Sequence, residues 1–105
     1  MTKRVRAFVP DLMDRSRLRA PEASVEFVAD PAVLLDEPAD LFVLDLARSD
    51  ALLAISGRSV GSGRVVGFAP HVDDEVMAAA REAGCDEVLP RSVFFRRFPD
   101  LGPDA

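Results

Sequence analysis

The sequence predicts an α/β domain built on a parallel sheet that helices cover on both faces. Residues Leu41 to Asp45 begin with four consecutive apolar residues that show no in-out alternation, which is typical of a strand buried on both faces. Short apolar runs also alternate with helix-start and helix-stop signals along the whole chain. The 105 residues, 49% of them apolar, suit one compact domain over residues 1–105.

In chain order, Val5 to Val9 is the first expected strand, because its apolar run stops at Pro10, which has no amide donor. Asp11 is a good N-cap for a helix of about two turns. Ser24 to Ala29 begins with alternating apolar and polar residues, which is typical of an edge strand with one exposed face. The aspartate and proline at the start of Asp30 to Asp36 predict a second helix over that range.

After the central strand, a helix is expected from Ala51 to Ile55, followed by a glycine-rich surface connection from Arg58 to Gly63. Val65 to Ala69 is the fourth expected strand. Asp73 to Ala83 carries the strongest helix signal, because acidic residues stand at its amino-terminal end, where they favour the helix dipole. Gly84 follows as its C-terminal stop.

The chain ends with a fifth strand signal from Cys85 to Leu89 and a last short helix that Ser92 is expected to cap. Strand and helix therefore alternate five times. Such alternation implies parallel strands joined by right-handed crossovers. The prediction is a flavodoxin-like sheet in the order 2-1-3-4-5 with helices on both faces.

Charge and cysteine content exclude several classes of function. The formal net charge is −5, and the 13 basic residues are mixed with 18 acidic ones and form no basic face, so we expect no nucleic-acid partner. A single cysteine, Cys85, excludes an intramolecular disulfide. The start of the chain does not resemble a signal peptide and no apolar run reaches membrane-spanning length. We expect a cytoplasmic protein without a membrane partner.

Three stretches resemble the receiver domains of two-component response regulators. Asp40 to Leu46 resembles the third receiver strand, which ends in the phospho-accepting aspartate, and Val65 to His71 resembles the fourth. Ala80 to Pro90 resembles the receiver segment that links the fourth helix, the fifth strand and a proline. The resemblance implies that Asp45 is the candidate phospho-acceptor.

The sequence departs from the receiver pattern at the residues that support phosphorylation. Receivers hold magnesium with two acidic residues after the first strand, whereas this chain offers Asp11 alone, so Asp11 and Asp45 would bind Mg²⁺ weakly. Ala69 stands where receivers have a hydroxyl residue, and Leu89 stands where they have a lysine. Arg91 is a nearby cation of different reach. The phosphorylation site is therefore predicted to be degenerate.

A second hypothesis makes the same sheet edge a small-molecule or phosphate-binding site, with enzymatic activity as one form of it. His71, Arg91 and Ser92 are expected there beside Asp45 and could bind an anion. A hydrolase lacks support, because Ser92 has no Gly-x-Ser-x-Gly elbow to expose a nucleophile. The residues favour a non-enzymatic role over catalysis.

The aromatic residues of the last helix have two interpretations. Phe94, Phe95 and Phe98 either fill the core, which is favoured, or leave one ring exposed as an anchor for a protein partner. The resemblance implies partner binding through this region. The preferred function is a stand-alone receiver-like signalling or protein-interaction module, and homodimerisation is left open.

Overall fold

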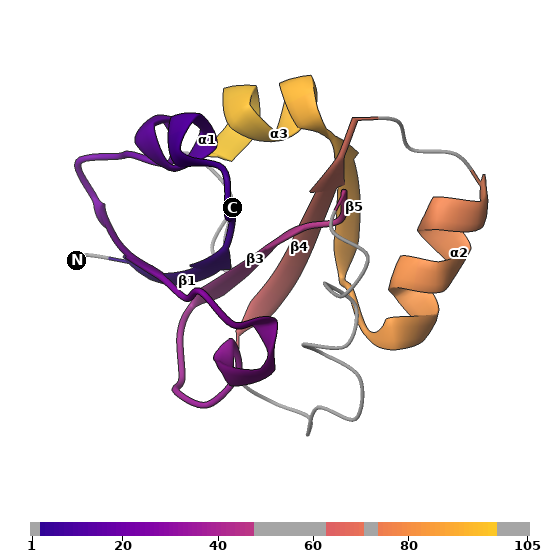
Figure 1. Cartoon of the computed structure of the whole chain (residues 1–105), viewed down its shortest axis with the longest axis horizontal. Helices are drawn as coiled ribbons and strands as arrows, with labels where there is room; N and C mark the ends of the chain where they lie inside the picture. Colours follow the sequence, from indigo (N-terminus) through magenta and orange to yellow (C-terminus); the bar gives the residue numbers. More distant parts are fainter. Residues whose placement is uncertain (1–2, 48–62, 71–73, 99–105) are drawn as a thin grey trace.

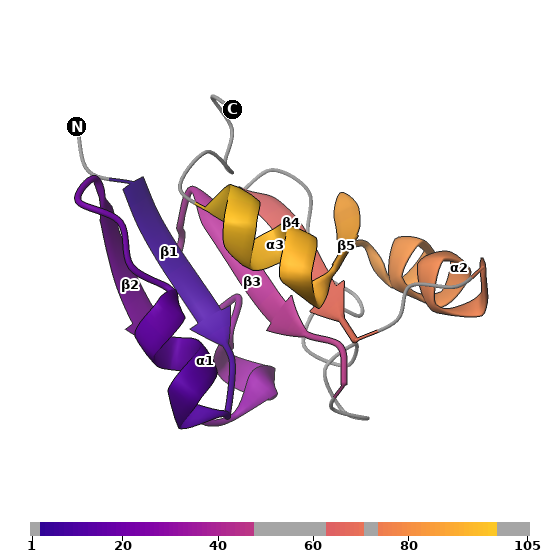
Figure 2. The same ribbon diagram turned by 90° about the horizontal axis from the view of Figure 1, so that it is seen from above.

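A computed structural model describes residues 3–47, 63–70 and 74–98. Five parallel strands form one sheet in the order β2-β1-β3-β4-β5, which confirms the predicted topology (Figure 1 and Figure 2). The strands are β1 Lys3–Phe8, β2 Ala23–Phe27, β3 Leu41–Asp45, β4 Arg64–Ala69 and β5 Glu87–Pro90. The helices are α1 Leu12–Arg17, the 3₁₀ helix η1 Pro31–Val33, α2 Asp74–Ala83 and α3 Arg91–Arg97.

Strand β3 is the centre of the sheet, and all five of its residues are buried, as the unbroken apolar run predicts. Its successive side chains point to opposite faces. Leu41 and Val43 belong to a core under α1 and α3, whereas Phe42 and Leu44 belong to a second core on the side of η1 and α2 (Figure 1). The two cores share one sheet, and strands β1, β3, β4 and β5 contribute to both, whereas β2 contributes only to the first.

The last helix is joined to the first core through stacked aromatic rings. Phe94 stacks on Phe68 of β4 with 4.7 Å between the ring centroids, and Phe95 meets both rings edge-on. Phe98 is also buried. These three phenylalanines of the last helix fill the core, which agrees with the favoured interpretation and leaves no exposed aromatic anchor among them.

The predicted second helix, Asp30 to Asp36, is wrong beyond its first turn, because η1 ends at Val33. Asp30 caps it as expected, with its side chain accepting from the Ala32 amide at 2.9 Å. Beyond that point the carbonyl oxygens of Val33 and Leu34 accept from the guanidinium of Arg6. Pro38 follows soon after, and a proline disfavours helical geometry in the residue before it.

Two boundaries near the end of the chain also differ from the prediction. Ser92 does not cap α3, because the helix starts one residue earlier and Pro90 occupies the N-cap position without a side-chain cap. Cys85 is not yet part of β5, since its amide donates to the Ala80 carbonyl and completes the end of α2. Gly84 has a positive φ of 120°, which allows this helix ending.

Some predicted features lie outside the described residues: the helix Ala51 to Ile55, nearly all of the glycine-rich connection, and His71. No helix in the described ranges is long and apolar enough to cross a membrane.

Candidate functional site

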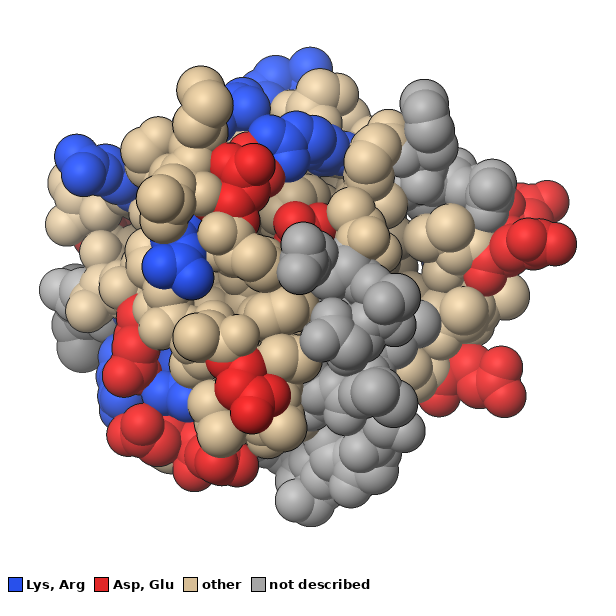
Figure 3. Space-filling view, in the orientation of Figure 1, with Lys and Arg blue, Asp and Glu red and all other residues tan. Residues whose placement is uncertain are grey.

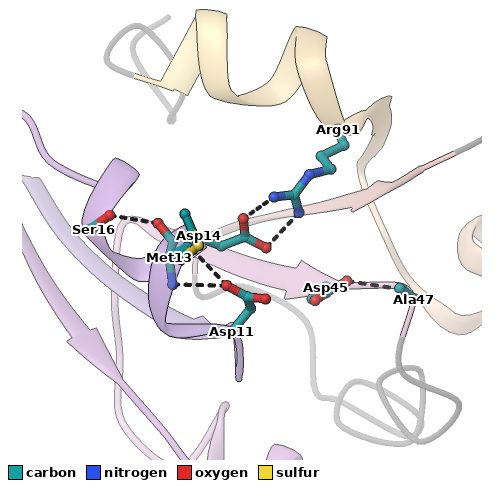
Figure 4. A network of polar contacts seen from close by, with 7 residues as sticks. All are labelled: Asp11, Met13, Asp14, Ser16, Asp45, Ala47 and Arg91. Carbon is teal, nitrogen blue, oxygen red and sulfur yellow. Dashed lines mark hydrogen bonds and ion pairs between the residues drawn. The ribbon is translucent and has the colours of Figure 1, made fainter.

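A pocket of about 380 Å³ lies at the carboxyl edge of the sheet, where ligands bind in open α/β folds. Its described charged residues are three carboxylates, from Asp11, Asp14 and Asp45, and one guanidinium, from Arg91 (Figure 4). The ends of β1, β3 and β5 bring these residues together. Sequence analysis placed three of the four at this edge and missed Asp14.

Asp45 is the last residue of β3, and its side chain is held by the chain that follows it. It is paired in register with Phe68 of β4 and is 7% exposed. Its Oδ1 accepts a hydrogen bond from the backbone amide of Ala47 at 3.0 Å. This local contact fixes the carboxylate at the lip of the pocket, where the strand ends.

Asp11 is the N-cap of α1, as predicted. Its Oδ1 accepts from the backbone amides of Met13 at 2.8 Å and Asp14 at 3.1 Å. The contact satisfies two amides at the start of the helix. One oxygen of this carboxylate is therefore already committed to holding α1 in place.

Asp14 and Arg91 form a two-pronged ion pair across the pocket. Nη1 of Arg91 donates to Oδ2 of Asp14 at 2.5 Å, and Nη2 donates to Oδ1. The side chain of Asp14 is only 3% exposed, whereas that of Arg91 is 38% exposed. A carboxylate so deeply buried needs a charged partner, and the planar fork of arginine matches it.

Arg91 pairs with Asp14 and also interacts electrostatically with the other two carboxylates of the pocket. Its hydrogen bonds to Asp14 raise its pKa above the ordinary value for arginine, burial opposes this, and the charges of Asp14, Asp45 and Asp11 add to the increase. Its guanidinium also lies 5.2 Å from the centroid of the Phe95 ring. Arg91 therefore stays positively charged at every pH at which the protein would be studied.

Ser92, the other anion-binding candidate in this segment, is exposed on α3 and does not line the pocket. The sequence did contain a signal for Asp14. Asp14 follows the N-cap Asp11 by three residues, so both carboxylates lie at the amino-terminal end of the same short helix. Such an acidic residue normally faces solvent. Its burial depends on Arg91, which is 77 positions away.

The pocket does not offer the donor set that a hard divalent cation prefers. Among the residues that the structure describes, no group of three or more His, Cys, Asp or Glu side chains could hold a metal ion. Asp11 and Asp45, the predicted ligands, share the pocket with the guanidinium of Arg91, which already neutralises Asp14. The residues present therefore do not fit Mg²⁺ well.

Neither a known protein family nor a curated protein matches the sequence. Solved structures do match. A response regulator from Hahella chejuensis aligns with a TM-score of 0.80 at 20% identity, covering 99% of this chain and 98% of the other. A response regulator from Thermotoga maritima aligns with a TM-score of 0.73 at 14% identity, covering 95% and 93%. The chain has the fold of a response-regulator receiver domain.

Other matched structures, all of low sequence identity to this chain, are of phosphorylated, metal-bound or BeF₃-activated proteins. A phosphorylated cyanobacterial phytochrome response regulator matches with a TM-score of 0.70 at 15% identity, covering 95% of this chain and 88% of that one. Further matches include a Mn²⁺-bound response regulator and a BeF₃-activated receiver domain. One match, from Silicibacter pomeroyi, is a DNA-binding regulator, so the absence of a nucleic-acid partner here stays a prediction.

Charge on the surface of this receiver fold is mixed. On the face shown in Figure 3, Lys and Arg side chains are interspersed with Asp and Glu and form no continuous basic patch. Large apolar side chains are exposed at Leu12 and Met13, which are 74% and 79% exposed at the start of α1, beside the pocket. They are the most exposed large apolar side chains among the described residues.

Proposed function

We propose that residues 1–105 form one receiver-like signalling module that recognises a protein partner and carries a degenerate phosphorylation site at Asp45. The observation that carries this proposal is the buried carboxylate of Asp45 at the end of the central strand, opening into the pocket at the carboxyl edge of a receiver fold. A cytoplasmic location belongs to the same proposal.

We call the site degenerate because the positive charge available to stabilise phosphoryl transfer at Asp45 is limited. In that reaction an oxygen of Asp45 would attack the phosphorus of an acyl phosphate, the bond from phosphorus to the acyl oxygen would break, and a carboxylate would leave. Nearby positive charge stabilises this transfer. The one described cation in the pocket, Arg91, is paired with Asp14. We therefore expect slow phosphorylation.

The rival proposal, a small-molecule or phosphate-binding domain, has less support. The pocket volume of about 380 Å³ lies within the range of ligand sites. However, three carboxylates face one guanidinium among its described residues, so its potential disfavours a free anion. Ser92, which this proposal would use, is exposed and is not among the residues that line the pocket.

Intact-mass measurement after incubation with a small acyl phosphate tests the proposal. We expect a partial, slow phosphoryl adduct on the parent that is absent from Asp45→Asn. Asp36→Asn is the matched control, because it removes an exposed carboxylate of the η1 segment and should label like the parent. No adduct on the parent, while an active receiver labels in the same buffer, would contradict phosphorylation at Asp45.

Partner binding is tested separately through the exposed start of α1. Leu12→Ser and Met13→Ser should leave folding intact, because both side chains are already in solvent. Sedimentation velocity of the parent and the double variant shows whether a second copy binds there. A dimer that persists unchanged in the double variant would exclude α1 as its interface.

A further inference from the structure

The cation that neutralises the carboxylate edge is supplied by the chain itself. Asp14 is buried, yet both of its oxygens accept from one guanidinium. The charge of Arg91 also acts on Asp45 and Asp11, since all three carboxylates favour its protonated form. One fixed side chain therefore interacts with every described carboxylate of the pocket.

A divalent cation at the same edge would meet two obstacles. It would be repelled by the guanidinium of Arg91, which is held in the pocket by Asp14 and by the ring of Phe95. It would also find Asp14 turned toward Arg91 and one oxygen of Asp11 occupied by the amides of α1. An internal ion pair thus uses the carboxylate oxygens that a metal in this pocket would need.

We infer that Arg91 is a built-in counter-ion that replaces a divalent metal at the carboxyl edge of this fold. The inference concerns the pocket of the proposed function and takes that pocket as the functional site. The rate of phosphorylation of Asp45 should then be the same in the presence of Mg²⁺ and in the presence of a chelator. Arg91 acts as a positioning and neutralising residue, and its removal frees Asp14 to turn toward the pocket.

Mn²⁺ titration without any phosphoryl donor tests this inference, with free Mn²⁺ followed by electron paramagnetic resonance. The parent is expected to bind Mn²⁺ at the edge only weakly, without saturation in the titrated range. In Arg91→Met the three carboxylates lose their cation, and we expect the affinity for Mn²⁺ to rise by about tenfold or more. Broadening of NMR signals near Asp45 should accompany that rise.

The matched control is Arg64→Met. Arg64 is 36% exposed at its side chain, close to the 38% of Arg91, and it pairs with Glu87 at the start of β4, away from the carboxyl edge. The Arg64→Met substitution removes one positive charge from the protein, as Arg91→Met does, but leaves the pair of Asp14 with Arg91 intact. Its affinity for Mn²⁺ should equal that of the parent.

A buried carboxylate without its partner can prevent folding, so Arg91→Gln, which retains a hydrogen-bond donor, is a second test variant. A folded Arg91 variant that gains no affinity overturns the inference. Saturable Mn²⁺ binding by the parent that Asp45→Asn abolishes also overturns it, and this measurement needs no Arg91 variant. Failure of the phosphoryl adduct would not affect either result, so the two proposals fail separately.

Discussion

Arg6 is a charged residue in the middle of a buried strand, with its side chain directed at η1. Its Nε donates to the Leu34 carbonyl at 2.9 Å, and Nη2 donates to the Val33 carbonyl at 2.8 Å. Nη1 pairs with Glu26 of β2 and with Glu37 at 3.0 Å. Each guanidinium nitrogen has a partner, which is the condition for burying such a group. Arg6 thereby ties the segment after β2 to the sheet.

Replacing Arg6 should be costly because the carbonyl oxygens that it satisfies are partly or fully buried. We expect Arg6→Met to lower the free energy of unfolding by about 2–4 kcal/mol in urea denaturation followed by circular dichroism. Arg4→Met, at an exposed position of the same strand, is the control and should change it by less than about 0.5 kcal/mol. Equal losses in both variants would contradict a specific role for Arg6.

At the residue scale, sequence reasoning succeeds where a residue's environment is local. Asp45 ends an apolar run and Asp11 precedes a helix, so both positions follow from neighbouring residues. Asp14 could not be recognised as buried, because its partner belongs to α3 and only the folded sheet brings the two together. The contacts of Arg6 with η1 were equally beyond sequence patterns, since they join β1 to a distant loop.

Helix α3 is an element held by packing more than by its own helical preference. It has seven residues and no side-chain cap, too short to be stable alone. Phe94, at 0% exposure, stacks on Phe68 and contacts Phe95 and Phe98. The same helix positions Arg91 at its first residue. The aromatic packing therefore determines where the guanidinium lies at the pocket.

Truncation of the central ring tests this dependence. Phe94→Ala should lower the free energy of unfolding by about 3–5 kcal/mol, because it leaves a cavity among the stacked rings. Ser92→Ala is the control on the same helix, and since Ser92 is exposed and caps nothing, its effect should stay below about 0.5 kcal/mol. Urea denaturation measures both. A loss near 1 kcal/mol for Ser92→Ala would restore the capping role predicted from the sequence.

For the whole molecule, the sheet is shared by two cores, so both should be lost in one transition. Cys85 is buried in the core on the α2 side and gives a probe of that face. We expect thiol labelling of Cys85 and circular dichroism to give the same urea midpoint. Phe94→Ala, on the opposite face, should lower both midpoints equally. Labelling of Cys85 at clearly lower urea would show that the α2 side opens separately.

The topology was predictable at this scale because alternating strand and helix signals, joined by right-handed crossovers, allow few arrangements. The end of η1 was not, because the segment around Val33 and Leu34 is held by Arg6 of another strand, and no local pattern indicates that contact. Local signals therefore fixed the order of elements, and contacts between elements set where each one stops.

The ion pair of Asp14 with Arg91 has a mechanical consequence. It braces the first helix against the last one on the same side of the sheet, across 77 positions of sequence (Figure 4). Any negative charge added to Asp45 would compete with Asp14 for the guanidinium. If the guanidinium turned toward Asp45, α1 and α3 would lose this brace together, and Leu12 and Met13, which are exposed on α1, would move with that helix. A chemical event at one strand end would then be transmitted to the outer surface as relative motion of two helices.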